Sequence, residues 1–169
     1  MYFKKMPTIL YPSNIGQVIV KDIFRRVALN GKTTTKAALN TYYVREGDTP
    51  EIVSYNFYGS AEYHWIVLLA NDIVNVHTEW PKRDSDIFKY VEDKYGAGNA
   101  TEVHHYRITG SDPEIIVDYN SAKVAAGTHS IVTNYDYEVN VNESKKQIKL
   151  IKPEFLKDFI TTYTRLMAS

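Results

Sequence analysis

The 169-residue chain contains no cysteine, which excludes disulfides, thiolate chemistry and zinc sites built on cysteine. Long hydrophobic runs are also missing, because the longest strictly apolar stretch, residues 65–70, falls far short of the ~20 residues that a membrane helix needs. The first residues, MYFKKMPTILYPSN, carry charges and prolines where a signal peptide needs an apolar segment. These absences predict a soluble protein that is made in the cytoplasm and has no membrane partner.

Net charge is also lacking, since 20 basic residues balance 20 acidic ones, but the two signs are unevenly distributed. Residues 1–36 have a balance of +6 and residues 42–102 a balance of −6. Opposed ends in a neutral chain argue against nucleic-acid binding, which needs an uncompensated basic face. They fit an intramolecular clasp or a head-to-tail contact between subunits, and they fit ordinary solvated surface charge equally well.

The N-terminal residues 1–17 show no periodicity, yet they are too apolar for a solvated tail. They predict an extended arm that docks onto its own domain or onto a neighbour. Residues 18–29 predict a β-type start followed by a short helix capped by Asp22, and residues 30–41 read as a polar loop. The chain also has fourteen tyrosines, a residue that suits interfaces and β-rich cores alike.

Residues 42–81 carry the clearest pattern in the chain. A β-type run over 42–45 precedes a turn, and Thr49 and Pro50 then suit the cap and first position of a helix that ends at Gly59. Ser60 caps a second helix, and Asn71 stands where a left-handed terminator is expected. The residues expected to face inward are Ile52, Val53, Asn56 and Phe57 on the first helix and Ala61, Trp65, Leu68 and Leu69 on the second.

The rest of the chain predicts a third helix, several strands and a terminal helix. Asp84 or Ser85 would cap the third helix, and Gly96 would end it after inward residues Ile87, Val91 and Tyr95. Strands are expected over 103–108, 115–119, 130–139 and 146–151, with a turn at 140–146, and a helix opens at Pro153. The fold class is α+β, divided into an arm and loop (1–41), a core with the following helix (42–96) and a β-rich segment with a terminal helix (97–169).

Few residues suggest catalysis or metal binding. His104 and His105 are neighbours on an expected strand, so their side chains should point to opposite faces and share no metal. The other histidines lack metal-ligand spacing, and the carboxylate pairs suit a helix start and a polar helix face. The sequence therefore predicts a protein that is not an enzyme and holds no metal or cofactor.

The pattern Tyr-x-Val-x-x-Gly-Asp-Thr-Pro at 42–50, with Tyr-Gly-Ser and His-Trp-Ile-Val-Leu-Leu-Ala-Asn after it, resembles a LysM module. Together with the following Trp-Pro, it is more similar to the LysM-like baseplate wedge subunits of T-even-like contractile-tailed phages. This resemblance implies a strand-helix-helix core. Its structural residues would be Tyr42, Val44, Gly47, Asp48, Ile52, Trp65, Leu69 and Asn71.

The resemblance continues outside this core, through Phe3, Pro7 and Tyr11 in the arm, Lys-Tyr-Gly at 94–96 and His-His-Tyr at 104–106. It also covers Asn142–Pro153, where Lys146 replaces the family's usual Arg. It implies a structural virion protein that binds wedge core proteins and joins neighbouring wedges in a sixfold ring around the central hub. A peptidoglycan-binding LysM module is the alternative. The residues expected to contact partners are Tyr2, Phe3, Pro7, Tyr11, Trp80, His104, His105, Tyr106, Glu143 and Lys146.

Overall fold

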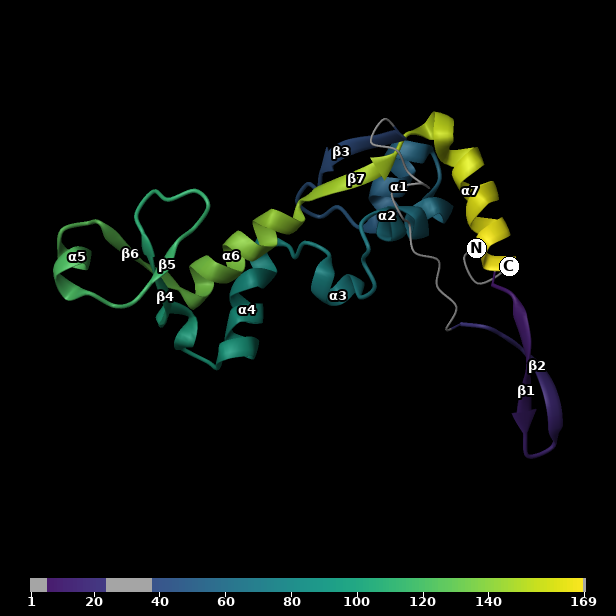
Figure 1. The fold of residues 1–169 in the computed structure, drawn as a ribbon, viewed down its shortest axis with the longest axis horizontal. Coiled ribbons are helices and arrows are strands. Elements are labelled where there is room, and N and C mark those ends of the chain that lie inside the picture. Colours follow the sequence, from purple (N-terminus) through teal and green to yellow (C-terminus); the bar gives the residue numbers. More distant parts are fainter. Residues whose placement is uncertain (1–5, 24–37, 169) are drawn as a thin grey trace. The chain divides into compact units, whose positions relative to one another are not determined.

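A computed structural model describes residues 6–23 and 38–168 of the chain (Figure 1). Helices and strands are mixed along the sequence and the sheets are small, so the predicted α+β class is confirmed. Contacts gather into two compact units. Unit 1 comprises Met1–Glu79 with Gln147–Ser169, and unit 2 comprises Trp80–Lys146.

Within the described part of the N-terminal segment, residues 8–21 form a β-hairpin rather than the extended arm that the sequence suggested. β1 (Thr8–Ser13) pairs antiparallel with β2 (Gly16–Lys21), and Ser13 lies opposite Gly16 at the closed end. A two-residue turn separates two β-type runs here, and Gly16 takes a φ of 117°, which favours glycine. The helix expected within 18–29 falls mostly outside the described residues.

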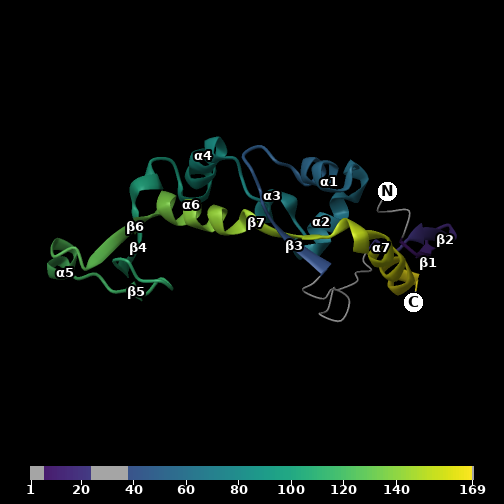
Figure 2. The ribbon, with the colours of Figure 1, turned by 90° about the horizontal axis from the view of Figure 1, so that it is seen from above.

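The centre of unit 1 is a two-stranded antiparallel sheet whose strands come from distant parts of the chain (Figure 2). β3 (Leu39–Tyr43) pairs with β7 (Gln147–Ile151), with Leu39 opposite Ile151. Between them in sequence lie α1 (Pro50–Tyr58), a 3₁₀ turn (Ala61–Tyr63), α2 (His64–Ala70) and the short α3 (Val76–Glu79).

The turn and caps that lead into α1 follow the prediction. Tyr42 donates its hydroxyl hydrogen bond to Asp48 Oδ2 at 2.7 Å, and the Arg45 backbone N–H donates to the same oxygen at 3.0 Å. Thr49 caps the helix by accepting from the Ile52 N–H, and Gly59 ends it with a φ of 75°. The Asp48 carboxylate therefore closes the turn that precedes α1.

The inward faces of the two helices match the prediction in part, since Val53 and Trp65 are buried and Leu69 packs against the core. Ile52 was expected in the core but is 44% exposed, and Asn56 and Ala61 are exposed as well. The buried residues are Pro50, Val53 and Ser54 on α1 and Trp65, Ile66 and Val67 on α2. In helices as short as these, the sequence pattern defines the inward face only weakly. Packing against the rest of the unit therefore determines which residues are buried.

Asn71 ends α2, but not in the way predicted. Its φ is −115°, and the left-handed position belongs to Asp72, with a φ of 55°. The Asn71 side-chain amide instead donates to the carbonyls of Val67 and Lys149, both at 2.8 Å, and accepts from the Lys149 N–H at 2.7 Å. One side chain thus joins the end of α2 to the edge of β7.

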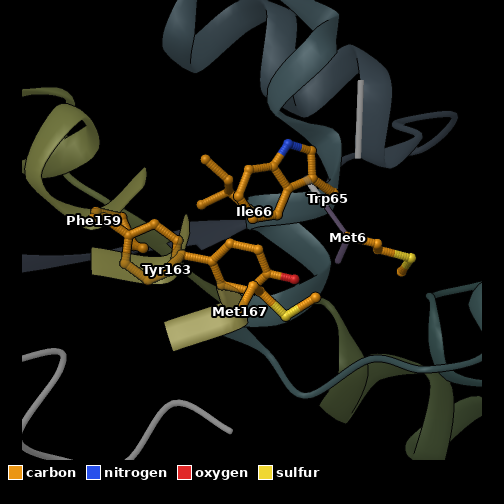
Figure 3. Close-up of a cluster of buried hydrophobic side chains, with 7 residues drawn as sticks. Met6, Trp65, Ile66, Phe159, Tyr163 and Met167 are labelled. Atoms are coloured by element: carbon orange, nitrogen blue, oxygen red, sulfur yellow. The ribbon is translucent and has the colours of Figure 1, made fainter. Parts of the chain in front are cut away.

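The main hydrophobic cluster of unit 1 includes the C-terminal helix α7 (Pro153–Ala168). Phe159, Tyr163 and Met167 are buried on one face. The helical spacing of Leu156, Phe159, Ile160, Tyr163 and Met167 in the sequence predicts this face. Figure 3 shows them together with Trp65, whose ring centroid lies 4.9 Å from that of Tyr163. Trp65 is therefore a core residue, as predicted. The other members of the cluster are Met6, Ile66 and Ile151.

Unit 2 combines two long α-helices and one short one with a three-stranded sheet of order β5-β4-β6. Its elements are α4 (Asp84–Tyr95), a 3₁₀ turn (Asn99–Thr101), β4 (Val103–Ile108), β5 (Ile116–Val117), α5 (Ser121–Ala125), β6 (His129–Thr133) and α6 (Asn134–Lys145). α4 buries Ile87 and Val91 and stops at Gly96, as predicted. Neither Asp84 nor Ser85 caps it, because the cap position is Arg83 and no side chain bonds there.

The expected strand over 130–139 and turn over 140–146 are wrong. The strand stops at Thr133, which forms a capping box with Asp136 and starts α6. The buried residues of α6 are Asn134, Glu138 and Asn142, four apart and all polar. Hydrophobic periodicity therefore gives no sign of this helix, while its tyrosines and valines favour a strand.

Candidate interaction surfaces

The hairpin of unit 1 presents an exposed apolar surface, here called the hairpin surface. Ile15 at its turn is 93% exposed, Ile19 71% and Leu10 62%. No charged residue occurs between Thr8 and Val20. The hairpin surface consists of Ile9, Leu10, Tyr11, Ile15, Val18, Ile19 and Val20.

Both faces of this hairpin are apolar. Leu10 lies opposite Ile19 on one face, whereas the pairs Ile9–Val20 and Tyr11–Val18 lie on the other. A strand that packs on its own core usually alternates between apolar and polar residues. The hairpin surface is therefore suited to being covered on both sides.

The base of the hairpin is attached to the core of unit 1. Met6 is buried in the main cluster, and Lys21 Nζ donates to the Met6 carbonyl at 2.7 Å. The Asp22 N–H donates to the carbonyl of Pro7 at 2.9 Å. Pro7, expected to contact a partner, thus lies at this base, Tyr11 lies on the hairpin itself, and Tyr2 and Phe3 lie outside the described residues.

A second exposed apolar group lies on the sheet of unit 2. Tyr106 on β4 stands opposite Ile131 on β6, and its ring lies 5.1 Å from that of Tyr119. Ile108, two residues along β4, shares this face. We call Tyr106, Ile108, Tyr119 and Ile131 the sheet surface; all but the half-buried Tyr106 are exposed.

The adjacent histidines do not point apart as predicted. A bulge between Val103 and His105 shifts the register of β4, and the two imidazoles meet with an Nδ1–Nδ1 distance of 2.8 Å. His104 stacks on Tyr137 with ring centroids 3.9 Å apart, and His105 Nε2 lies 3.1 Å from a Glu114 oxygen. That hydrogen bond with His105 holds the pKa of Glu114 below its usual value. The histidines belong to a polar network within unit 2.

A buried carboxylate joins the two long helices of unit 2. Glu138 on α6 accepts from Lys94 Nζ at 2.6 Å and from the Tyr95 hydroxyl at 2.8 Å. Burial raises the pKa of Glu138, but the two hydrogen bonds and the charge of Lys94 outweigh burial, so the pKa is lowered overall. Glu138 is ionised and paired at neutral pH, and it fastens α6 to α4.

Glu143 and Lys146, both expected to contact partners, interact with each other. Lys146 Nζ lies 2.8 Å from Glu143 and 3.3 Å from Asp84. The hydrogen bond to Glu143 and the bond to Asp84 raise the pKa of Lys146. The Lys146 ammonium group therefore already interacts with two carboxylates of its own chain at the end of α6, which leaves it less able to bind a partner.

Trp80, another residue expected at an interface, is only 6% exposed. Two residues further on, the Lys82 N–H donates to Asn142 Oδ1 at 2.7 Å, and the Asn142 amide donates to the Lys82 carbonyl at 3.0 Å. Asn142 therefore pairs with the backbone just after Trp80. In this conformation the indole offers little surface to a partner.

Within residues 6–23 and 38–168, no group of three or more His, Asp or Glu residues is placed to hold a metal ion. In the same ranges, none of the helices has the length and hydrophobicity needed to cross a bilayer. The features that do stand out are the two exposed apolar surfaces, one on each unit. Exposed apolar surfaces of this kind are typical of a protein that is a subunit of a larger assembly.

Comparison with known proteins identifies the family. Residues 2–124 match the family described as base plate wedge protein 53, and the chain belongs to this family. The chain is also 26% identical, over 174 aligned residues, to the baseplate wedge protein gp53 of Enterobacteria phage T4. That alignment covers 91% of this chain and 87% of the phage T4 protein.

Sequence reasoning missed two features of these surfaces. The hairpin had a readable signal, because Pro-Ser-Asn-Ile-Gly at 12–16 separates two apolar runs of similar length. The sheet surface had no such signal apart from Tyr106, which was expected to contact a partner, since its members come from three separate segments that only the fold brings together.

Proposed function

We propose that this protein is a structural subunit of a phage tail baseplate. In this role it binds wedge core proteins and joins neighbouring wedges into a sixfold ring around the central hub. It acts through contacts with neighbouring proteins and not through catalysis. It resides in the virion after synthesis in the host cytoplasm. Membership of the baseplate wedge family is the observation that carries this proposal.

The two surfaces support a joining role. A protein that links two neighbours needs at least two separate contact surfaces, and the hairpin surface and the sheet surface lie on different units. Both hold aromatic and branched aliphatic side chains, the types that fill the centres of interfaces. The predicted segments 1–41, 42–96 and 97–169 and the contact residues named from sequence stay predictions about this assembly.

The order β3, α1, α2 also supports the LysM-like assignment, because it reproduces the strand, turn and two helices that the sequence pattern implied. We infer that this unit serves as a platform for assembly. The family match does not favour the alternative of a peptidoglycan-binding module.

Three experiments test the proposal. Tails purified from infected cells should contain the protein in a fixed ratio to other wedge proteins. A chain that lacks the hairpin residues 8–21 but keeps the core residue Met6 should fold but fail to join wedges. Normal baseplates assembled from the truncated protein would remove the N-terminal segment from the joining role. Saturable retention of the purified protein on peptidoglycan sacculi would instead favour the glycan-binding alternative.

A further inference from the structure

The hydrogen-bonding pattern of the hairpin shows which backbone groups face outward. The bond from the Asp22 N–H to the Pro7 carbonyl marks these residues as a hydrogen-bonded pair of the antiparallel ladder. Such pairs alternate with pairs whose N–H and C=O groups point away from the partner strand. By the register of the hairpin, Gln17 and Ile19 on β2 and Leu10 and Pro12 on β1 therefore point their backbone groups outward.

The two edges of the hairpin are not equivalent. Pro12 has no N–H and sits at an outward position, so it interrupts the edge of β1. The edge of β2 offers the outward N–H groups of Gln17, Ile19 and Lys21 without interruption. In the part of the chain that the structure describes, β2 pairs only with β1. The edge of β2 is thus open to another strand.

The hairpin also lacks the usual protection of an open edge. Exposed edge strands commonly carry charged residues that prevent pairing with other chains, but Thr8 to Val20 contain none. The one charged residue of β2 is Lys21 at its end, and its Nζ donates to the Met6 carbonyl. A two-stranded hairpin by itself is at best marginally stable in water. An added strand and a covering apolar surface would supply the contacts that it lacks.

We propose that the edge of β2 is extended by a β-strand of a different baseplate protein, whose apolar surface covers the hairpin surface. This inference rests on the proposed function. A covering surface without a strand would leave the outward N–H and C=O groups of β2 buried and unpaired, at a cost of several kcal/mol. The partner therefore presents both a free strand edge and an apolar surface.

Charge identifies the surroundings of that strand, and symmetry argues against a second copy. Residues 1–7 and 21–26, which flank the hairpin, contain five Lys or Arg and one Asp. Acidic side chains around the partner strand would complement these basic residues. Two copies joined through β2 would form a closed twofold pair, which cannot relate neighbours around a sixfold ring.

The matched variants Ile19→Pro and Leu10→Pro test the edge. Leu10 and Ile19 lie opposite each other on one face, so each change removes a similar apolar side chain. Each also removes an outward N–H, but only Ile19→Pro removes it from the open edge. We expect Ile19→Pro to lower incorporation into baseplates at least tenfold and Leu10→Pro to lower it only a few-fold, measured by mass spectrometry of purified tails.

Equal effects of the two variants would overturn the pairing through β2. Circular dichroism and tryptophan fluorescence of both purified variants show whether unit 1 stays folded. If wild-type protein is absent from purified tails, the proposed function fails. If it is present and Ile19→Pro is incorporated normally, only this inference fails.

A photo-crosslinking residue, p-benzoyl-phenylalanine, in place of Gln17 provides a test that leaves the hairpin backbone intact. In assembled baseplates, irradiation should yield a product that joins this chain to a different baseplate polypeptide. A product between two copies of this chain, or no product from incorporated protein, would overturn the inference.

Discussion

The most specific prediction about stability concerns the replacement of the Asn71 side chain. Asn71→Ala removes three hydrogen bonds, two of which hold Lys149 on the edge of β7. Each bond contributes ~1 kcal/mol, and water can replace part of this at a half-buried site, so we expect unit 1 to lose about 2–3 kcal/mol. Asn56→Ala on the exposed face of α1 is the matched control and should change the free energy of unfolding by less than about 0.5 kcal/mol.

The assay is urea unfolding followed by the fluorescence of Trp65 in a Trp80→Phe background, which reports on unit 1. Two units need not unfold together, so a signal local to one of them is required. A loss below about 0.5 kcal/mol for Asn71→Ala would refute the view that this side chain fastens β7.

Asn71→Asp separates the hydrogen-bond argument from a simple loss of packing. The new carboxylate can still accept from the Lys149 N–H, but it faces the carbonyl oxygens of Val67 and Lys149. The folded state then favours the protonated acid, so its pKa lies above the ~3.9 of an unfolded aspartate. Relative to wild type, this variant should be less stable at pH 7 and should recover as the pH falls toward 4. An equal deficit at both pH values would contradict this account.

Three further outcomes follow from the packing and the charges. Trp65→Ala should cost ~3–5 kcal/mol because it empties a site against Tyr163, and unchanged melting would place the indole at the surface. Because the folded pKa of Glu138 is lowered, its contribution is present above the unfolded value of ~4.3 and is lost as the pH falls through the folded value. Glu138→Gln should therefore lower the melting temperature at pH 7 and flatten the acid limb of the stability profile. Thr133→Ala should remove about 0.5–2 kcal/mol from unit 2, measured by chemical unfolding, and no change would mean that the capping box is dispensable.

Several local signals in the sequence predicted the local structure correctly. The caps of α1, the stop at Gly96 and the apolar face of α7 depend on residues within a few positions of one another. The family resemblance was also readable, because its motifs are short and ordered along the chain. Such signals can be interpreted without knowing which distant parts of the chain come into contact.

The features that could not be predicted depend on distant partners. The pairing of β3 with β7 joins strands that no periodicity connects, and Asn71 acts through Lys149, far along the chain. Hydrophobic periodicity does not reveal α6, because the buried residues of this helix are polar. Each of them needs a partner elsewhere in the chain, as Glu138 needs Lys94. The sheet surface likewise exists only once β4 and β6 are paired.

The pairing of β3 with β7 also has a consequence for synthesis. All of unit 2 is translated after β3 and before β7, so the ribosome must pass Ile151 before the sheet of unit 1 can close. The α7 residues of the main cluster come later still. An incomplete chain, whether from premature termination or from degradation of its C-terminus, therefore lacks a finished unit 1. Completion of the core thus distinguishes full-length subunits from truncated ones before assembly.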